Sequence, residues 1–341
     1  MPDMNIFDED PFTAQSLTLA INNVPATPGQ VGQIVDFEAE GITTTDVPIA
    51  NINGSLELVE PSARGGPGET VDHDKWNLRK ISTAHFQRDE HVLADEVQNV
   101  RDNEMTGQTA LMTVEKLVNN KLARHARDFD LNDEWMKVGV INGKVVSGKG
   151  KVVLDIYQEF GITPAAVVEF DLTNEAFGFR KASMNLVMSM EDDLLATGYG
   201  HVHTLCGREF FLSILDNEEY KSTFLNTTQA AQLRDAQPDI VTVGGVTYER
   251  YKSSKVARDA VGGNFIPDDE ARAFFVGVPG LYLSRYAPAD YWDTVNTMGL
   301  PRYSREMTSQ RTEKAAKFEV QTNPLHVITQ PKTLRKLKLK P

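Results

Sequence analysis

The chain has 341 residues, 40% of them hydrophobic and 24% charged, which is ordinary for a folded soluble protein and leaves room for one to three domains. Its single cysteine, Cys206, excludes an intramolecular disulfide framework, and we expect neither a membrane span nor a secretory signal at Met1–Asn5. The formal net charge of −13 disfavours a sequence-reading DNA or RNA binder, because such proteins neutralise phosphates with a basic surface, although it permits a shell that merely confines DNA.

The first quarter of the chain predicts one short helix and a long β-hairpin. Residues 1–32 are rich in Pro, Asn, Thr and Gly, with a helical composition only at 13–22, so this segment is either a loose terminus or an arm that orders against a neighbour. Between 33 and 88, short runs of β-type residues flank the glycine-rich turn Arg64–Gly68. This pattern favours a two-limbed hairpin that lies on something, because isolated hairpins are marginal in water.

A long amphipathic helix is predicted within residues 89–135. Apolar residues recur at spacings of three and four from Leu111 to Ala126, while charged and amide side chains occupy the other face. Gly107 marks an interruption between this piece and a shorter helical piece that begins at Asp89. A helix of about 25 residues would be roughly 37 Å long, enough to brace an elongated subunit.

The rest of the chain alternates short strands and helices. A hairpin is predicted over 138–157, and helices are predicted over 176–197 and 204–224. Further strands are predicted at 240–251, 273–286 and 315–339. The fold class is therefore α+β, with a compact middle region and an extended remainder, and with neither an internal repeat nor a low-complexity linker.

The run His201–Cys206 is the most tempting chemical site. Imidazole and thiolate ligands suit zinc, and alternate residues of a strand share a face. A zinc site needs a third or fourth ligand, however, and this run has no recognisable spacing to the other histidines considered, which are His73, His85, His91 and His125. We interpret the run as a loop that leads into a helix.

Other candidate motifs have simpler structural interpretations. Gly148–Lys151 lacks the spacing of a phosphate loop and favours a hairpin turn, and Gly262–Asn264 favours a plain loop. The acid pairs Asp192–Asp193 and Asp268–Asp269 are typical of solvated carboxylates rather than acid–base catalysts. Since no nucleophile-elbow pattern is present either, the sequence predicts no enzyme, and we expect no catalytic, cofactor-binding or metal-binding residues.

The C-terminus is basic although the chain is acidic. The last ten residues include the cations Lys332, Arg335, Lys336, Lys338 and Lys340, with leucines interleaved. One interpretation is an edge strand whose lysines deter unwanted pairing. The other is a contact with an acidic surface of a neighbour or with packaged DNA.

Short sequence motifs in the last third of the chain carry a family resemblance. The polar segment Tyr303–Met307 is flanked by two pairs of motifs. They are Gly263–Pro267 with Ala273–Val276 before it and Asn323–Leu325 with Thr329–Pro331 after it. The order of these motifs and the residues in them resemble the major capsid proteins of tailed bacteriophages, specifically the lambda-type capsid protein E family. The resemblance is strong after about Gly262, and the first hundred residues match mainly by shape.

The resemblance implies a tailed-phage major capsid fold, with an N-terminal arm, an extended β-hairpin loop, a long spine helix in a peripheral domain, and an axial domain. In chain order it implies the arm, the hairpin loop, the peripheral domain with its spine helix, a hairpin with the axial domain, the peripheral return strands and a closing strand, at residues 1–32, 33–88, 89–137, 138–290, 291–322 and 323–341.

The resemblance also implies a head protein that self-assembles into hexamers and pentamers of an icosahedral shell around double-stranded DNA and expands on maturation. The implied partners are other copies of the chain, a portal protein, a scaffolding protein or maturation protease, a decoration protein and DNA contacted without sequence specificity, with no membrane and no cofactor. The implied location is the virion, and the host cytoplasm before assembly. The alternative is a nanocompartment shell protein or another virion structural protein such as a tail component.

Overall fold

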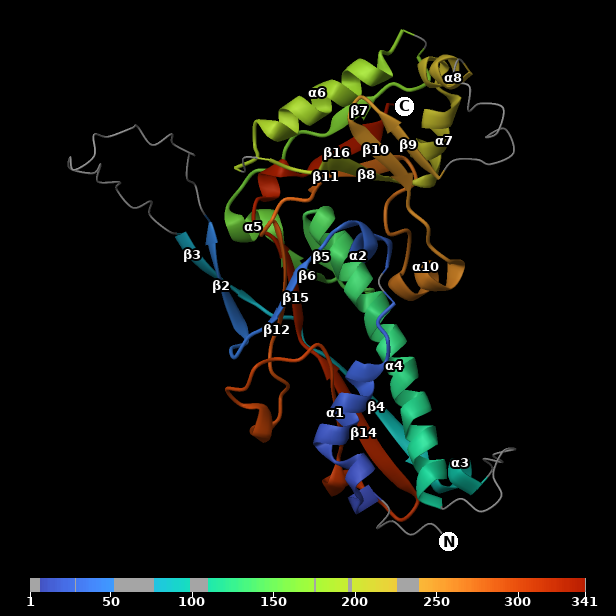
Figure 1. The fold of residues 1–341 in the computed structure, drawn as a ribbon, viewed down its shortest axis with the longest axis vertical. Coiled ribbons are helices and arrows are strands. Elements are labelled where there is room, and N and C mark those ends of the chain that lie inside the picture. The colour runs from blue at the N-terminus through green and yellow to red at the C-terminus, as the bar shows by residue number, and fades with distance from the viewer. Residues whose placement is uncertain are drawn as a thin grey trace, which may run out of the picture.

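The protein is elongated, with a broad upper part and a narrow lower part that are joined by one long helix (Figure 1). The computed structural model describes residues 7–27, 29–51, 77–98, 110–174, 176–195, 198–225 and 239–340. Its α-helices are α1 (Ala14–Asn23), α2 (Gln30–Ile34), α3 (Ala94–Gln98), α4 (Ala110–Ile141), α5 (Ile156–Phe160), α6 (Phe179–Glu191), α7 (Arg208–Asp216), α8 (Glu218–Leu225) and α10 (Lys255–Val261). Short 3-10 turns occur at η2 (Asp10–Phe12), η3 (Trp292–Thr294), η4 (Thr308–Gln310) and η5 (Pro331–Thr333).

The predicted amphipathic helix is α4, and it is longer than expected. It has 32 residues, or about 48 Å, and its stripe of Val118, Leu122 and Ala126 is buried as the spacing predicts. The predicted hairpin at 138–157 begins too early, because Val138–Ile141 form the last turn of α4. Val138, Val140 and Ile141 are β-branched and resemble a strand in the sequence, but all three are buried, and tertiary packing overrides their weak helix propensity.

The upper part contains a mixed sheet, here called the upper sheet, covered by helices such as α6 and α7 (Figure 1). Its two central strands are buried along nearly their whole length, although both also carry polar residues, such as His203 and Thr204 in one and Arg272 in the other. In spatial order its strands are β7 (Val168–Phe170), β16 (Arg335–Leu339), β11 (Glu270–Val276), β8 (His201–Cys206), β10 (Val246–Arg250) and β9 (Ile240–Val243). The predicted loop at His201–Cys206 is therefore wrong, and the helix predicted from 204 begins only at Arg208, since Thr204–Cys206 complete β8.

The basic C-terminus lies inside this sheet. β16 pairs with β11 on one side and with β7 on the other, so the prediction of an edge strand is wrong. The interleaved leucines point into the core, and the cations between them meet acids of neighbouring segments. The pairs are Arg335–Asp193 at 2.6 Å, Lys336–Glu270 at 2.6 Å, Lys338–Asp269 at 3.5 Å and Lys340–Asp171 at 3.3 Å.

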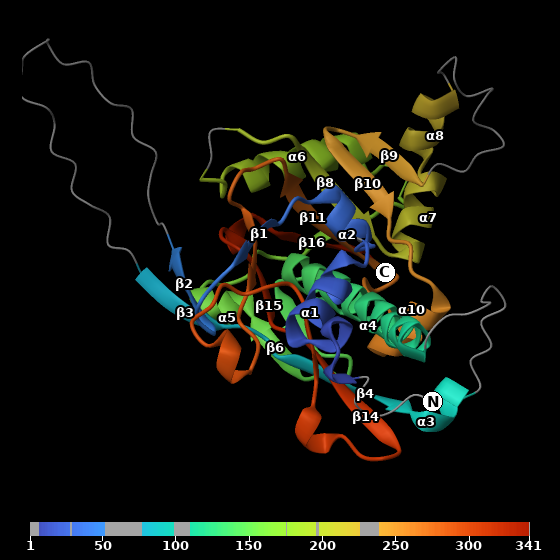
Figure 2. The same ribbon diagram turned by 60° about the horizontal axis from the view of Figure 1, so that its bottom comes forward.

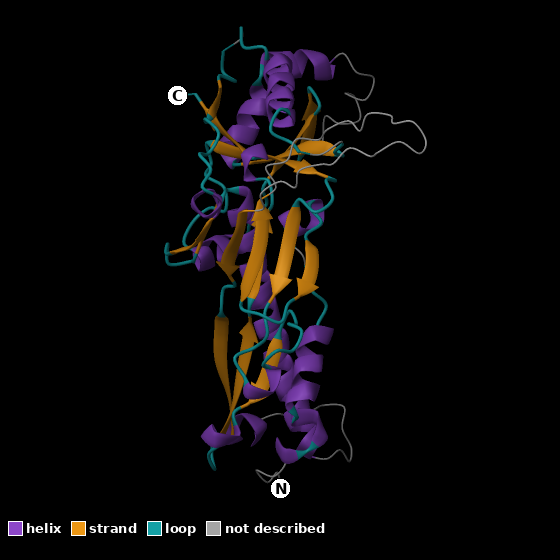
Figure 3. Ribbon diagram, turned by 90° about the vertical axis from the view of Figure 1, so that its left-hand side faces the viewer, coloured by secondary structure: helices purple, strands orange, loops and turns teal. Residues whose placement is uncertain are grey.

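Two further sheets continue down the molecule. The middle sheet has the order β1 (Glu38–Gly41), β12 (Tyr282–Tyr286) and β15 (Pro324–Ile328), and the lower sheet has the order β13 (Tyr303–Glu306), β14 (Ala315–Thr322) and β4 (Phe86–Leu93). From the strand side, α4 runs behind both sheets (Figure 3). The predicted helix start at Asp89 is wrong, because residues 86–93 pair with β14 along their whole length.

Both predicted hairpins are present. β2 (Asp46–Asn51) pairs antiparallel with β3 (Asn77–Ser82), which confirms the two-limbed hairpin, while its predicted tip at 64–68 lies outside the described residues. Its predicted start at 33 is too early, because α2 and β1 precede it. β5 (Lys144–Val146) pairs with β6 (Val152–Asp155), and Gly150, at φ 78°, lies in the predicted turn between them.

The N-terminal helix is ordered on the chain's own lower part. α1 buries Leu17 and Ile21, and Phe7 and Phe12 pack edge-to-face or tilted against Phe318 of β14. The interpretation as a loose terminus is therefore wrong for residues 7–24, which share a small apolar core with α4 and the lower sheet (Figure 2).

Candidate functional site

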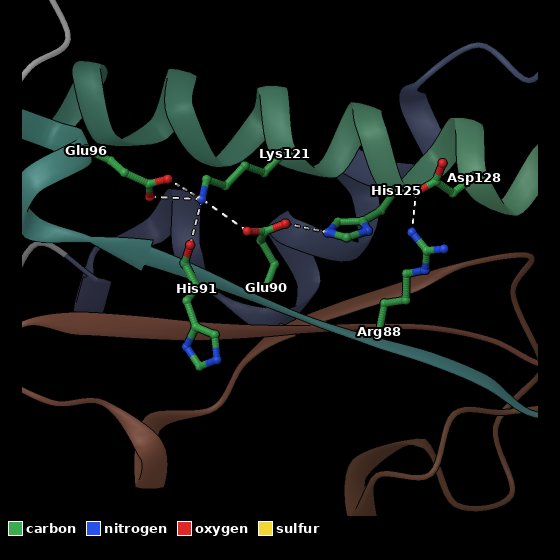
Figure 4. Close-up of polar contacts among 7 residues, drawn as sticks. All are labelled: Arg88, Glu90, His91, Glu96, Lys121, His125 and Asp128. Atoms are coloured by element: carbon green, nitrogen blue, oxygen red, sulfur yellow. Dashed lines mark hydrogen bonds and ion pairs between the residues drawn. The ribbon is translucent and has the colours of Figure 1, made fainter. Parts of the chain in front are cut away.

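A charged cluster holds the lower half of α4 against β4 and α3 (Figure 4). The ammonium group of Lys121 donates to Glu90 Oε1 at 3.1 Å, to Glu96 Oε2 at 2.9 Å and to the carbonyl oxygen of His91 at 2.6 Å. One cation of α4 thereby binds the strand and the short helix together. The cluster is partly buried, so its hydrogen bonds are less screened than those on an open surface.

Glu90 has a second partner on α4. His125 Nε2 lies 3.0 Å from Glu90 Oε2, and one turn further on Asp128 binds Arg88 of the same strand. Burial by itself would raise the pKa of Glu90, but the hydrogen bond and charge of Lys121 lower it overall. Glu90 is therefore a carboxylate, and the cluster forms a row of polar contacts along the contact between helix and strand.

A buried Ser–His–Asp arrangement joins α4 to the middle sheet. His326 Nδ1 lies 2.7 Å from Ser284 Oγ, and His326 Nε2 lies 2.7 Å from Asp133 Oδ1. Burial alone would raise the pKa of Asp133, but the charges of His326 and Lys137 lower it well below the ordinary value.

This arrangement differs from a hydrolytic triad in two ways. Its serine bonds to Nδ1 and its aspartate faces Nε2, the reverse of the hydrolase pattern, and both Ser284 and His326 are fully buried. A substrate cannot reach the hydroxyl, so we interpret the three side chains as a structural tie. They are 42 to 193 residues apart in the sequence, and no sequence pattern announces them.

A buried glutamate connects α4 to the N-terminal segment and the upper part. Glu134 accepts hydrogen bonds from the backbone N–H of Val31 at 2.8 Å and of Gly32 at 3.3 Å in α2, and from Tyr251 Oη at 3.0 Å. Burial raises the pKa of Glu134, and the amide hydrogen bonds partly oppose this. Its neighbour Gln30 donates to Glu249 Oε1 at 2.5 Å, so α2 is also bound to β10.

The residues considered for zinc do not converge. On β8, His201 and His203 share one face with their rings 5.8 Å apart, whereas Cys206 lies on the other face. Burial lowers the pKa of His203 to about 4 and raises that of the Cys206 thiol. His125 pairs with Glu90, and His73 lies outside the described residues. Among the described residues, no group of three or more His, Cys, Asp or Glu side chains is placed to hold a metal ion.

The other candidate motifs have structural partners. Gly148–Lys151 forms the β5–β6 turn, and Gly262 ends α10 in the left-handed conformation at φ 79°. In the acid pairs, Asp193 binds Arg335 and Asp269 binds Lys338. What the structure does bring together are the ties around α4, which fix one helix to three sheets and to the N-terminal segment.

A solved structure has the same arrangement. A prophage protein of E. coli CFT073, described as a capsid protein, superposes with a TM-score of 0.59 at 10% sequence identity, covering 96% of this chain and 99% of that one. The likeness shows that the chain has the fold of a capsid protein.

The sequence itself identifies the family. The chain belongs to the family described as phage major capsid protein E, which it matches over residues 13–339. The major capsid protein of Salmonella phage Felix O1 is 25% identical over 358 residues, covering 95% of each chain. That of Pseudomonas phage KPP10 is 26% identical over 349 residues, covering 95% of this chain and 96% of the other. No helix in the described part of the chain is long and apolar enough to cross a membrane.

Proposed function

We propose that this major capsid protein assembles with copies of itself into hexamers and pentamers of an icosahedral shell that encloses double-stranded DNA. The observation that carries the proposal is the family match over residues 13–339, which spans the whole braced fold from α1 to β16. A closed container built from one chain needs heterologous contacts that close into rings. Many such contacts, each weak, add up to a stable lattice.

We also propose roles for the parts of the chain. The β2–β3 hairpin is the extended loop of residues 33–88, α4 is the spine helix of a peripheral domain at 89–137, and the upper sheet belongs to an axial domain at 138–290. β13 and β14 are the peripheral return strands of 291–322, and 323–341 closes the chain. Residues 1–32 act as an arm, and α1 anchors it to the lower part.

Maturation is proposed to expand the shell. The expected movers are the hairpin and α4, because the hairpin projects from the body and α4 joins the upper part to the lower one (Figure 1). The ion pair of Lys121 and the contact of His125 with Glu90 would keep the lower half of α4 on β4, so that this half moves as one unit with its sheet.

The proposed partners are a portal protein, a scaffolding protein or maturation protease, a decoration protein and DNA contacted without sequence specificity. The subunit would fold in the host cytoplasm and end in the virion. Both curated relatives are phage major capsid proteins, which favours a phage head over a nanocompartment or a tail component.

The test is assembly of the purified full-length chain. We expect sedimentation velocity and negative-stain imaging to show capsomer-sized rings or closed icosahedral particles as protein concentration and salt are varied, alone or with its scaffolding protein. A chain that remains a folded monomer under all of these conditions would contradict the proposal. Particles that package a protein cargo instead of DNA would favour the nanocompartment.

A further inference from the structure

The loop between β12 and β13 presents large apolar side chains to solvent. The side chain of Trp292 is 95% exposed, and those of Val295 and Met298 are 57% and 58% exposed. Monomeric proteins rarely expose apolar residues in such a group, and tryptophan is enriched among the anchors of protein interfaces.

This loop is held in shape by its own hydrogen bonds. Thr294 Oγ1 donates to the carbonyl oxygen of Ala289 at 2.7 Å, and Thr297 Oγ1 donates to that of Thr294 at 2.7 Å. At its base the Arg305 guanidinium lies 4.5 Å from the centre of the Tyr291 ring. The loop therefore presents its apolar side chains in a fixed arrangement, which lowers the entropy cost of binding a partner.

Acidic residues surround this loop. Asp290 and Asp293 are exposed within it, and Glu38 and Glu40 are exposed on β1. The loop and β1 are adjacent, because the N–H of Gly299 donates to the carbonyl oxygen of Ile42, at 2.9 Å, just after β1. Two of these acids also have cationic partners, Arg285 for Glu40 and Arg305 for Asp293. We call this surface the acidic flank, defined by Glu38, Glu40, Asp290, Trp292 and Asp293.

A basic surface follows the solvent side of α4. Arg124 and Arg127 are exposed, one turn apart, on the side of the helix away from Leu122 and Ala126. Two more exposed cations lie beside them, Lys252 just before α10 and Lys255 at its start. Acids are also present here, because Lys252 binds Asp239 at 2.7 Å and Asp259 is exposed on α10. We call this surface the basic flank, defined by Arg124, Arg127, Lys252 and Lys255.

The basic flank contains an apolar recess. Arg127 and Lys252 line a recess of about 370 Å³ whose wall also includes Leu131, Ala257 and Phe265. Two carboxylates line it as well, and each has a partner within the subunit, Arg302 for Asp130 and Tyr251 for Glu134. The recess offers apolar contact next to positive charge. This combination complements the acidic flank, where an exposed tryptophan lies between carboxylates.

The two flanks lie on opposite sides of the subunit. In Figure 1 the orange-red excursion after β12 projects on the left, while α4 and α10 form the right-hand side. In Figure 3, which shows the left-hand side, strands face the viewer and α4 lies behind them. Surfaces on opposite sides of one chain can pair head to tail and close into a ring.

We propose that the acidic flank of one copy binds the basic flank of the next copy around a capsomer, with Trp292 as its apolar anchor. This inference rests on the proposed shell function and assigns the residues of one of its contacts. Charge complementarity steers the approach of two subunits and fixes their register. The alternative occupant of the basic flank is packaged DNA. A phosphate backbone would contact the cations, but it would fill neither the apolar recess nor the surface around Trp292.

The test is a charge swap between two variants of the full-length chain. Arg124→Glu with Arg127→Glu and Lys255→Glu leaves one cation beside three carboxylates on the basic flank, so that both flanks are acidic. Glu38→Lys with Glu40→Lys and Asp290→Lys leaves one acid beside three lysines on the acidic flank, so that both flanks are basic. We expect each variant alone to need at least about 10-fold more protein than wild type for half-maximal association in sedimentation velocity. Mixed in equal amounts, the variants should associate again, as alternating rings with an even number of subunits. Six-membered rings should then form, and five-membered rings should not.

Trp292→Ala should weaken association of the otherwise unchanged chain by at least about 10-fold. The matched control is Arg180→Glu with Lys181→Glu on α6, which reverses two exposed charges outside both flanks and should leave association unchanged. Circular dichroism should show that every variant is folded.

Several results would overturn the contact. If the acidic variant still associates like wild type but binds a DNA duplex less tightly, the basic flank is a DNA surface. The contact is also wrong if mixing restores nothing, or if the α6 control fails equally. A wild-type chain that never associates contradicts the proposed function itself, whereas failure of the swap in an assembling chain contradicts only this assignment.

Discussion

The tie between Ser284, His326 and Asp133 shows how a few buried polar atoms can fix one element against another. His326 is fully buried between α4 and the middle sheet, and both ring nitrogens have a polar neighbour at 2.7 Å. Burying an imidazole without polar partners costs free energy, because its hydrogen bonds to water are not replaced. Only one docking position of the helix supplies those partners to His326, so the tie specifies that position. The ammonium group of Lys137, one turn beyond Asp133, lies 2.6 Å from the carboxylate of Asp133.

Asp133→Asn should destabilise the unassembled subunit by about 1–3 kcal/mol, because the substitution leaves buried His326 without its carboxylate. Urea unfolding at neutral pH measures the loss, with Asp192→Asn as the control, since Asp192 is exposed at the end of α6. The control should change stability by no more than about 0.5 kcal/mol. Equal losses in the two variants would show that the tie contributes nothing specific.

The same pair of variants has a defined pH dependence. The pKa of Asp133 is lowered on folding, so its contribution is complete above the ordinary aspartate value of 3.8 and is lost as pH falls through the lower folded value. The difference between wild type and Asp133→Asn should therefore be constant near neutral pH and shrink in acid. A difference that instead grows as the pH falls would contradict the assignment.

At the scale of elements, the sequence predicts best where one periodicity is long and uninterrupted. The stripe from Val114 to Ala126 predicts α4, and the alternating residues of 240–251 predict β9 and β10. Prediction from the sequence fails where burial in the folded protein decides whether a segment forms a helix or a strand. Val138–Ile141 look like a strand and are helical, whereas Asp89–Leu93 look like a helix and pair with β14.

The ties around α4 were out of reach of sequence patterns for a different reason. Lys121, His125 and Asp128 look like the solvated edge of an amphipathic helix, and nothing local indicates that β4 supplies their partners. Only the family resemblance, carried by short sequence motifs in the last third of the chain, indicated the class of protein.

Lys121→Met tests whether the charged cluster holds α4 to β4 and α3. The substitution keeps most of the side-chain volume but removes the donor shared by Glu90 and Glu96, and we expect a loss of about 1–2 kcal/mol in urea unfolding of the unassembled subunit. Arg124→Met, on the exposed side of the same helix, is the matched control and should change stability by less than about 0.5 kcal/mol. If both substitutions cost the same, the cluster is only a surface feature.

For the whole molecule, the end of the chain joins all the large sheets. In succession, β14 pairs in the lower sheet, β15 in the middle sheet and β16 in the upper sheet. A path of 25 residues, from Ala315 to Leu339, thus runs the length of the molecule beside α4. Helix and strands together make the subunit one braced body.

Removal of residues 335–341 should therefore prevent folding of the upper part, although these residues are the end of the chain. The truncation separates β7 from β11, exposes the backbone edges of both, and leaves Glu270 without the cation of Lys336. We expect insoluble protein, or soluble protein with reduced sheet content in circular dichroism. Removal of only residues 340–341 takes away the ion pair of Lys340 with Asp171 and its backbone hydrogen bond to Phe170, leaves β16 intact, and should leave a folded subunit that still assembles. A soluble, cooperatively unfolding protein after the longer truncation would mean that β16 is dispensable, as an edge strand would be.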